Sequence, residues 1–307
     1  MTDPTPDLNT TSLVSTSSLE YVGFETPDLD RMIDYYTKVL DFVAVDRDGG
    51  RAFLTTDFRH HSIVLQQSDT AKARSFVGLR ISEDLDSAER RLREGGHQVV
   101  RRSDPAPATP TVLELLEPGT GTPIELIDAA SGRQSTALST LRPFKLGHVA
   151  AFTPDLARTQ EFYEGSLGFR WSDTVADFFV FLRCNTDHHA ANFMASTKRE
   201  GMHHIAFETR DLDHLQTLLD HLASRDVRLE WGPGRHGPGH NIFTYHRDPD
   251  GNNIELFCQL DSMPDETLGY FDPRPWHTEF PQYPKTWEAD LAAINSWGPV
   301  EWSQLEH

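Results

Sequence analysis

The chain has 307 residues, 37% of them hydrophobic, and a formal net charge of −19, and this length fits two domains with tails. The negative charge excludes nucleic acids and anionic membrane surfaces as partners, because binding them depends on Lys and Arg that replace phosphate counterions. No apolar run reaches the roughly 18 residues that a membrane span needs, so we expect no membrane association.

Residues 1–18 form the first segment, and their polar composition predicts a disordered tail. The segment has neither a basic start nor an apolar stretch, so it does not match a secretory signal. The two cysteines, Cys184 and Cys258, are too few for a disulfide framework, and we expect both to be small core residues. These features together predict a cytoplasmic protein.

An internal repeat begins directly after this tail. Residues 19–42 (LEYVGFETPDLDRMIDYYTKVLDF) match residues 146–169 (LGHVAAFTPDLARTQEFYEGSLGF), and each copy reads as a strand, a TPDL turn and a helix. Residues 76–96 match residues 203–224 in the same order, again as a strand followed by a helix. The chain is therefore predicted to be a tandem duplication.

The repeat also predicts the domain organisation. Alternating strands and helices indicate an α+β fold, with a first domain over residues 19–130 and a second over residues 145–260. Residues 131–144, rich in Ser and Thr, are expected to link the two domains. Residues 261–307 change to a composition rich in Pro and Trp, and we expect this segment to pack across a surface as a possible lid.

Only the second half carries a complete set of metal-binding side chains. Two imidazoles and one carboxylate stand in three predicted strands: His148, His204 and Glu255. The aligned positions of the first half are Tyr21, Val77 and Glu125, so two of the three differ. Such a set suits divalent iron with open coordination positions, and manganese or cobalt as substitutes. The alternative is that each residue is an ordinary core histidine or surface acid.

Adjacent histidines at His203 and His204 require a choice, because neighbouring side chains of a strand point to opposite faces. The repeat register favours His204 as the ligand, since Ile205 then points to the opposite face. His203 is expected beside the ligands or at the surface, and His240 and His246 are expected in loops or at the surface.

Three stretches of the second half resemble a known family: residues 145–155 (KLGHVAAFTPD), 201–209 (GMHHIAFET) and 232–257 (GPGRHGPGHNIFTYHRDPDGNNIELF). They are similar to type I extradiol dioxygenases of the vicinal oxygen chelate superfamily, especially those that cleave catechol or homoprotocatechuate. The resemblance covers residues 19–259, and its His-Gly, Tyr and Asp-Pro-x-Gly-(x)3-Glu elements occur in order up to Glu255. It implies paired βαβββ modules that form two half-open barrels, with metal only in the second.

The resemblance also implies an activity, which is the opening of a catechol-type ring by Fe(II) and O2 to give a semialdehyde, often in a homotetramer. His189 corresponds to the histidine that faces oxygen and transfers protons, with its neighbour His188 as the alternative. His236 and Tyr245 correspond to residues that hydrogen-bond the substrate oxygens. From the residues alone, Tyr245 also fits a packing role and His236 an ordinary loop position.

Two other functions are compatible with the sequence. A glyoxalase-type lyase or isomerase would need a fourth protein ligand with zinc or nickel, and a small-molecule binding protein of the bleomycin-resistance type would need no metal. For the dioxygenase, we expect the pocket wall to include residues 232–240 and residues 271–276, with the latter as part of the lid.

Overall fold

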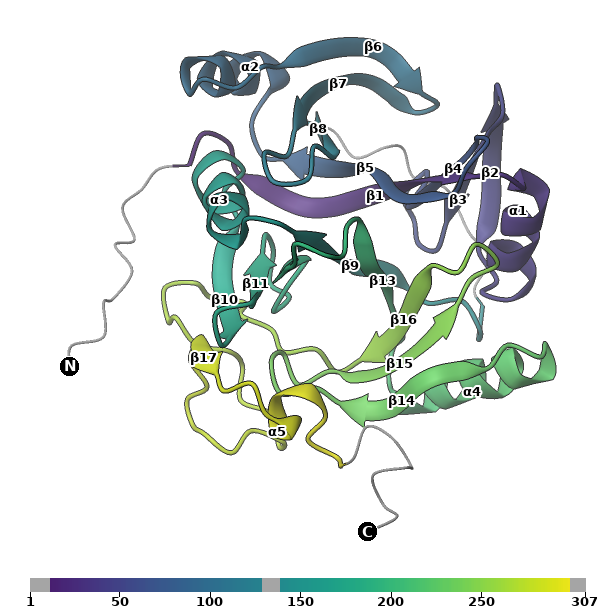
Figure 1. Ribbon diagram of the computed structural model, residues 1–307, viewed down its shortest axis with the longest axis vertical. Coiled ribbons are helices and arrows are strands. Elements are labelled where there is room, and N and C mark those ends of the chain that lie inside the picture. The colour runs from purple at the N-terminus through teal and green to yellow at the C-terminus, as the bar shows by residue number, and fades with distance from the viewer. Residues whose placement is uncertain (1–11, 129–138, 299–307) are drawn as a thin grey trace.

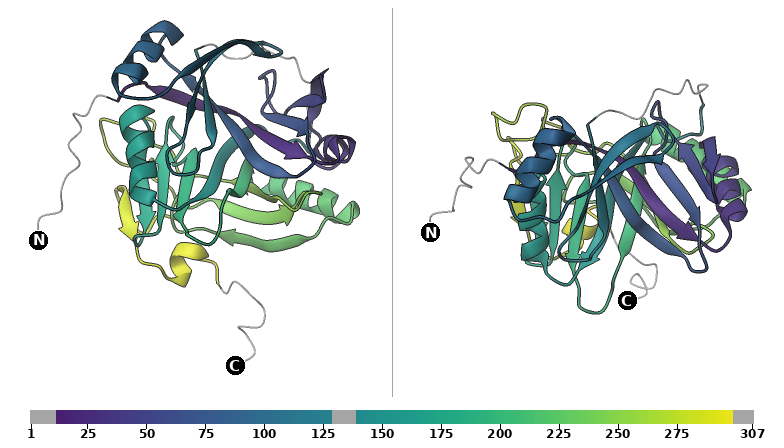
Figure 2. Two further views of the ribbon diagram at one scale, coloured as in Figure 1. Left: turned by 45° about the horizontal axis from the view of Figure 1, so that its top comes forward. Right: turned by 90° about the horizontal axis from the view of Figure 1, so that it is seen from above.

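The computed structural model describes residues 12–128 and 139–298. They form two curled sheets, one from each half of the chain, with the helices at the periphery (Figures 1 and 2). Most of the predicted tail and of the linker at residues 131–144 lies outside the described residues. Within the described ranges, no helix is both long enough and apolar enough to cross a bilayer.

The first sheet has eight strands in the order β2-β3-β4-β1-β5-β8-β7-β6. The elements of this half are, in chain order, β1 (Thr16–Thr26), α1 (Leu29–Lys38), β2 (Val43–Asp48), β3 (Arg51–Thr55), β4 (Ile63–Gln67), β5 (Lys72–Ile81), α2 (Leu85–Glu94), β6 (Val100–Ala106), β7 (Thr109–Leu116) and β8 (Pro123–Ile127).

The second sheet has nine strands in the order β14-β15-β16-β13-β9-β12-β11-β10-β17. The elements of this half are β9 (Lys145–Thr153), α3 (Leu156–Glu161), the π-helical turn η1 (Phe162–Ser166), β10 (Arg170–Val175), β11 (Phe179–Arg183), β12 (Ala191–Ala195), β13 (Met202–Glu208), α4 (Leu212–Ser224), β14 (Leu229–Arg235), β15 (Ile242–Arg247), β16 (Asn253–Cys258), β17 (Lys285–Trp287) and α5 (Leu291–Ile294).

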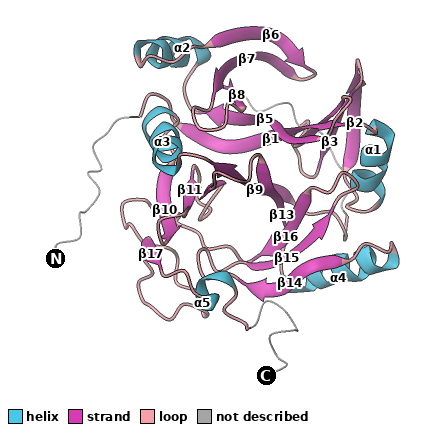
Figure 3. Cartoon of the chain, viewed as in Figure 1, coloured by secondary structure: helices cyan, strands magenta, loops and turns pink. Residues whose placement is uncertain are grey.

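Each half consists of two copies of one β-α-β-β-β module (Figure 3). The first strands of paired modules run antiparallel, β1 with β5 and β9 with β13. The last strand of a module runs parallel to its first strand, as β4 does beside β1 and β16 beside β13. The α+β prediction and the tandem βαβββ arrangement are therefore confirmed.

The four module helices begin with the same local signal. Asp28, Asp84, Asp155 and Asp211 are their N-caps, and each carboxylate accepts a hydrogen bond from the backbone N–H three residues later. Each cap satisfies a donor that the helix leaves free and contributes about 1 kcal/mol. The Asp-Leu pairs that revealed the repeat therefore determine where its helices start.

A continuous apolar core joins the two halves. Its buried residues come from both sheets, and the rings of Phe42 and Phe207 meet edge to face with centroids 5.0 Å apart. Cys184 and Cys258 are buried and unpaired, as predicted. The two barrels therefore share one hydrophobic core and are packed against each other.

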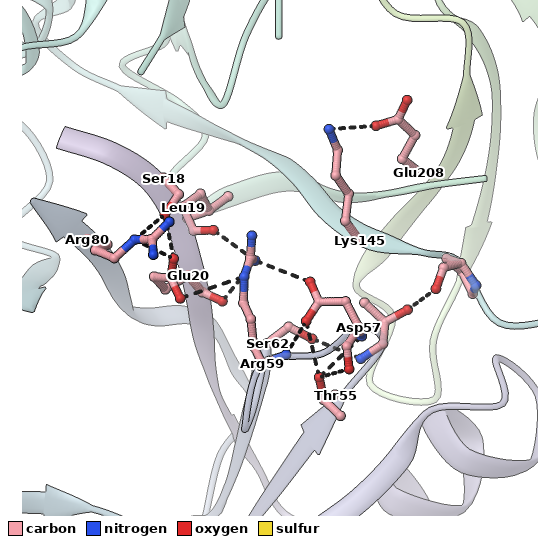
Figure 4. A network of polar contacts seen from close by, with 12 residues as sticks. Ser18, Leu19, Glu20, Thr55, Asp57, Arg59, Ser62, Arg80, Lys145 and Glu208 are labelled. Carbon is pink, nitrogen blue, oxygen red and sulfur yellow. Dashed lines mark hydrogen bonds and ion pairs between the residues drawn. The ribbon is translucent and has the colours of Figure 1, made fainter. Parts of the chain in front are cut away.

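Buried acids in this core region are paired with cations. The Glu20 carboxylate is 3.6 Å from Arg59 and 3.3 Å from Arg80, and nearby Lys145, at the start of β9, is 2.9 Å from Glu208 (Figure 4). An unpaired carboxylate at the buried position of Glu20 would carry a large desolvation penalty. These pairs therefore make the polar part of the interior compatible with burial.

The assignment of residues 12–18 to a disordered tail was wrong. Val14 is fully buried, and β1 begins at Thr16. The backbone N–H groups of Leu13 and Val14 donate to the carbonyls of Gly165 and Ser166 at 3.0 Å, which attaches this segment to the second half. The order comes from partners that are distant in the sequence, so local polarity did not reveal it.

Candidate metal centre

Three side chains from the adjacent strands β9, β13 and β16 converge at one buried point. They are the three predicted ligands, His148, His204 and Glu255. The Nε2 atoms of the two histidines are 3.1 Å apart, and Glu255 Oε2 is 3.3 Å from the Nε2 of His148 and 3.1 Å from that of His204. Both outer strands pair with β13, so they present these side chains on one face of the sheet.

The distances among these three donor atoms fit a single ion. Nitrogen and oxygen ligands lie about 2.0–2.2 Å from a bound metal such as zinc, so two of them are about 3.0 Å apart at a right angle and about 3.4 Å at a tetrahedral angle. The observed separations of 3.1–3.3 Å fall within this interval. Three ligands on one side leave the other side open for substrate, as in the 2-His-1-carboxylate sites of non-haem iron oxygenases.

The protonation states also suit metal binding. Burial lowers the pKa of His148, which favours the neutral imidazole that a metal needs. Burial alone would raise the pKa of Glu255, but His148 and His204 together hold the pKa of this carboxyl well below its usual range. Glu255 is therefore an ionised carboxylate, and burial favours the neutral form of His148, whose nitrogen has a free lone pair.

Neighbouring polar groups orient these ligands. Asn241 Nδ2 donates to Glu255 Oε1 at 2.8 Å, and the Tyr245 hydroxyl donates to Glu255 Oε2 at the same distance. Nδ1 of His203 is 2.6 Å from Nδ1 of His204. Such contacts fix ligand orientation and commonly strengthen metal binding. Asn241 was not predicted, because a single amide after a Gly/Pro-rich loop carries no recognisable signal.

His188 and His189 point in different directions, as neighbours on an extended chain do. The His189 ring packs on His148, with centroids 4.2 Å apart, and lines the cavity at the metal centre. The His188 ring points away, with Nε2 3.0 Å from the Asp173 carboxylate and Nδ1 2.9 Å from Nδ1 of His189. Burial lowers the pKa of His189 well below its usual value. The geometry thus favours His189 over His188 for contact with a ligand.

His236 directly follows β14 and Tyr245 lies within β15, and both are beside the metal centre. Nε2 of His236 is 3.2 Å from the Tyr245 hydroxyl, and its Nδ1 donates to the Ile294 carbonyl at 2.7 Å. Phe243 stacks on the His236 ring and Trp231 on the Tyr245 ring, with interplanar angles of 10° and 11°. Burial lowers the pKa of His236 to about 4. Both predicted substrate-contact residues are therefore held rigidly at the site.

All of these groups face one cavity of about 220 Å³. Besides the three ligands, its polar wall consists of His189, Asn192, His203, His236, Asn241 and Tyr245. His203 thus lies beside the ligands and not at the surface. Ala293 and Ile294 of α5 complete the wall, which corrects the expectation for residues 271–276. Phe271 instead packs behind the site on His188, with centroids 4.8 Å apart.

The counterpart of His204 in the first half is Phe76 and not Val77. In the β1–β5 register Gly78 lies opposite Tyr21, and Phe76 lines the same cavity as Tyr21. Val77 points to the other face and belongs to the apolar core. The alignment of the two halves by sequence alone ignored the bulges that interrupt these strand pairs, and a shift of one residue reverses the face of a side chain.

The matching site of the first half is closed by protein groups. The Tyr21 hydroxyl donates to Glu125 at 2.7 Å, and the Arg102 guanidinium pairs with both Glu125 and Glu114. Arg102 supplies positive charge next to the glutamate but has no lone pair for a metal. The two halves therefore share a fold but differ in chemistry at this position.

His240 and His246 were expected in loops or at the surface; His240 lies in the loop after β14, as expected, whereas His246 is a buried strand residue. His246 is fully buried on β15, and its Nε2 is 2.6 Å from the Tyr35 hydroxyl of the first half. His240 and His277 contact opposite oxygens of Asp261 at 2.7 and 2.8 Å, the other group in the described ranges with ligand spacing. The Asp261 carboxylate accepts a hydrogen bond from each imidazole, so these three side chains form a structural contact. This contact joins the loop after β14 to the C-terminal segment.

One protein-family model matches residues 18–126 and 145–256, which are the two halves of the chain. It describes the Glyoxalase/Bleomycin resistance protein/Dioxygenase superfamily. The chain belongs to this superfamily. Membership in the superfamily agrees with the vicinal oxygen chelate fold expected from the sequence, which is confirmed.

Proteins with similar sequences include a metapyrocatechase and an extradiol dioxygenase. Metapyrocatechase 2 of Cupriavidus necator is 31% identical over 153 residues, which are 48% of this chain and 48% of that protein. The iron-dependent extradiol dioxygenase of Rhodococcus jostii is 25% identical and is matched over 93% of its length and 83% of this chain.

Two solved structures share the fold over nearly the whole chain. The Mn(II)-bound glyoxalase from Novosphingobium aromaticivorans superimposes with a TM-score of 0.81 at 22% identity, over 94% of this chain and 92% of that one. Homoprotocatechuate 2,3-dioxygenase from Brevibacterium fuscum, in its complex with 3,4-dihydroxyphenylacetate, gives 0.79 at 24% identity, over 98% and 95%.

Proposed function

We propose that the protein is an extradiol dioxygenase that opens the ring of a catechol-type diol with O2. The observation that carries the proposal is the meeting of three metal ligands with His189, His236 and Tyr245 in one buried cavity. A metal centre surrounded by groups that accept and donate protons is what ring opening of a diol requires. The ring-cleaving enzymes among the relatives support this assignment.

The metal that fits best is Fe(II), held by His148, His204 and Glu255, with Mn(II) as an alternative. Two imidazoles and a carboxylate on one side of an ion are typical of non-haem iron oxygenases. When bound, Fe(II) supplies a redox-active centre with open positions at which a diol and O2 are brought together.

His236 is suited to accept a hydrogen bond from a diol hydroxyl. The Ile294 carbonyl can only accept, so Nδ1 of His236 carries the proton and its Nε2 has a free lone pair. Because the pKa of His236 is lowered to about 4, the imidazole is neutral near pH 7. The Tyr245 hydroxyl lies beside this Nε2, so we propose that the two groups together hold one substrate oxygen.

We propose that His189 holds the proton that the diol loses. The Asp173 carboxylate accepts from Nε2 of His188, and Nδ1 of His188 lies 2.9 Å from Nδ1 of His189. We propose that Nδ1 of His189 carries its proton in this contact, so that its Nε2 is unprotonated in the cavity. We propose that this nitrogen takes up a diol proton and returns it when the ring opens, with His188 and Asp173 as positioning residues.

We further expect a cytoplasmic homo-oligomer, with a tetramer favoured, that takes a small aromatic diol and binds neither nucleic acid nor membranes. The net charge of −19 supports the absence of polyanionic partners. Light scattering of the purified protein tests the oligomeric state, and a monomer at micromolar concentration would contradict the tetramer.

Metal analysis and oxygen uptake test the proposed function. Protein purified without oxygen is expected to bind one iron per chain and to consume O2 when catechol is added, with the yellow colour of a ring-opened semialdehyde. Glu255→Gln is expected to lower iron affinity by more than the roughly 10–100-fold that loss of an orienting partner costs. The matched variant Glu125→Gln makes the same change at the twin position and is expected to keep its iron.

Three outcomes would count against the proposal. Equal iron loss in both glutamine variants would contradict a metal site confined to the second half. Bound zinc or nickel without oxygen uptake would favour a glyoxalase-type reaction. Protein that binds no divalent metal would favour a small-molecule binding role.

A further inference from the structure

The cavity at the metal centre has one polar side and one apolar side. The metal ligands, His236 and Tyr245 come from β9 and the segment from β13 to β16, and His189 directly precedes β12. The opposite wall comes from β10–β12 and α5, and its main side chains are Val175, Phe179, Phe181, Met194, Ala293 and Ile294. A diol held at the metal centre therefore directs the rest of its ring toward an apolar surface.

The described residues of this wall offer no Lys or Arg that could pair with a negative charge. No Lys or Arg occurs among the described residues that line the cavity, and its only carboxylate is the ligand Glu255. A carboxylate on the substrate ring would lose its hydration without gaining an ion pair, which is costly in an apolar environment.

The cavity has room for a substituent. A dry apolar cavity of about 150 Å³ holds benzene, so the observed 220 Å³ accommodates a benzene-sized ring and a few further carbon atoms. Phe178 and Ile294 line the cavity and are 39% and 43% exposed, so they mark its mouth. The path from the metal centre toward solvent is therefore apolar, and a longer hydrophobic group can extend along it.

We propose that the substrate is a catechol whose ring carries an uncharged hydrophobic substituent, alkyl or aryl, and that ring carboxylates are disfavoured. This inference rests on the proposed function, because it assumes that the diol end binds at His148, His204 and Glu255. The apolar wall then acts as the specificity subsite, and burial of each apolar carbon atom against it strengthens binding.

Binding of two matched catechols tests the inference. 4-Propylcatechol and 3,4-dihydroxyphenylacetate share the diol and have side chains of similar length, but only the second is charged. Calorimetry with the Fe(II)-loaded protein under anaerobic conditions is expected to give a Kd at least about tenfold lower for 4-propylcatechol, a difference of about 1.4 kcal/mol. Equal or tighter binding of the carboxylate would overturn the inference.

A charge placed in the wall tests its location. Met194→Lys keeps an unbranched side chain of similar length and is expected to reduce the preference for 4-propylcatechol by at least about tenfold, whereas Met194→Leu should retain the preference. Ile294→Lys, at the exposed mouth, makes the same test where a cation is more easily tolerated. An unchanged preference in the folded lysine variants would show that the substituent lies elsewhere and would overturn the assignment of this wall.

Turnover in air separates this inference from the proposed function. A binding preference for 4-propylcatechol without ring opening of any catechol would support the apolar subsite and overturn the dioxygenase assignment. Ring opening of both compounds, with the carboxylate compound bound as tightly or more tightly, would support the dioxygenase assignment and overturn the apolar subsite.

Discussion

His246 is a neutral histidine in the contact between the two halves. It is fully buried, and its one hydrogen-bond partner in the described structure is the Tyr35 hydroxyl, at 2.6 Å from Nε2. Burial lowers the pKa of His246 from 6.5 to about 3. No carboxylate lies near enough to offset this effect, so protonation of the ring is incompatible with the folded state near neutral pH.

This burial predicts a specific loss of stability in acid. The folded pKa lies below the unfolded pKa, so the contribution is present above pH 6.5 and is lost as the pH falls from 6.5 toward 3. Each pH unit in this window lowers the free energy of unfolding by about 1.4 kcal/mol for this group. The free energy of unfolding of His246→Gln should therefore fall by about 2 kcal/mol less than that of the wild type when the pH is lowered from 7.5 to 5.

Urea unfolding at the two pH values measures this difference. The variant is expected to be less stable than the wild type at pH 7.5, because the Tyr35 contact changes, but to depend less on pH. An identical pH dependence of the two proteins would contradict a buried neutral His246.

Elements of the C-terminal segment support His189 and His236 through hydrogen bonds. The Asp173 carboxylate, which lies behind His188 and His189, accepts from the Lys285 backbone N–H and from Trp287 Nε1 of β17, each at 2.8 Å. Further along, the Ile294 carbonyl of α5 accepts from His236. The C-terminal segment is thus part of the site and not only its cover, and its opening as a lid stays a prediction.

Asn295 is the residue whose substitution tests the role of this segment. Its side-chain oxygen accepts from the backbone N–H groups of Arg235 and Trp297 at 3.0 and 3.1 Å, so it fixes α5 beside His236. Asn295→Ala should lower kcat/KM for catechol by roughly tenfold, because loss of a buried hydrogen bond costs about 1–3 kcal/mol and loosens the Ile294 carbonyl. Iron content should stay at the wild-type level, since no ligand is touched.

Asn295→Asp is the matched control, because a carboxylate retains the acceptor oxygen while losing the amide. It is expected to keep most of the wild-type kcat/KM. If Asn295→Ala also lost iron, or if both variants lost the same activity, the effect would not pass through the position of His236.

At the scale of the whole molecule, a buried polar network ties the two halves together. Arg74 on β5 pairs with Glu117, and both contact the hydroxyl of Tyr163 from η1 of the second half, at 3.1 Å and 3.0 Å. Arg74 and Glu117 are 3% and 0% exposed. Each charge therefore depends on the other, and the network depends on both halves being in place.

Removing one partner of this pair should destabilise the protein strongly. Arg74→Met leaves the Glu117 carboxylate buried without a cation, which typically costs about 3–5 kcal/mol. The double variant Arg74→Met with Glu117→Leu should recover much of this loss, since no buried charge remains. The measurement is the urea unfolding midpoint of each variant.

An exposed ion pair provides the control for this comparison. Arg247 and Glu230 are 2.7 Å apart with side chains 48% and 49% exposed, and such pairs contribute about 0–1 kcal/mol. Arg247→Met should therefore shift the midpoint little. A shift as large as that of Arg74→Met would show that burial is not what makes the Arg74 pair important.

The sequence by itself determined the features that depend on local pattern. Alternating apolar residues and the Asp-Leu helix starts predicted the modules, and their repetition predicted two similar halves. The difference between the halves singled out His148 and His204, because the first half has no imidazole at either aligned position, and Glu255 joined them as the carboxylate that both halves share. These signals work because strand and helix periods constrain side-chain direction within one element.

The tertiary structure alone decided what depends on contacts between distant segments. Phe76 replaced Val77 as the twin of His204 because bulges shift the strand register, and His246 became a core residue because Tyr35 of the other half covers it. Asn241 and the Ile294 carbonyl reached the site through loops and a C-terminal helix. Such contacts leave no period in the sequence, since their geometry is fixed only when the two sheets and the C-terminal segment pack together.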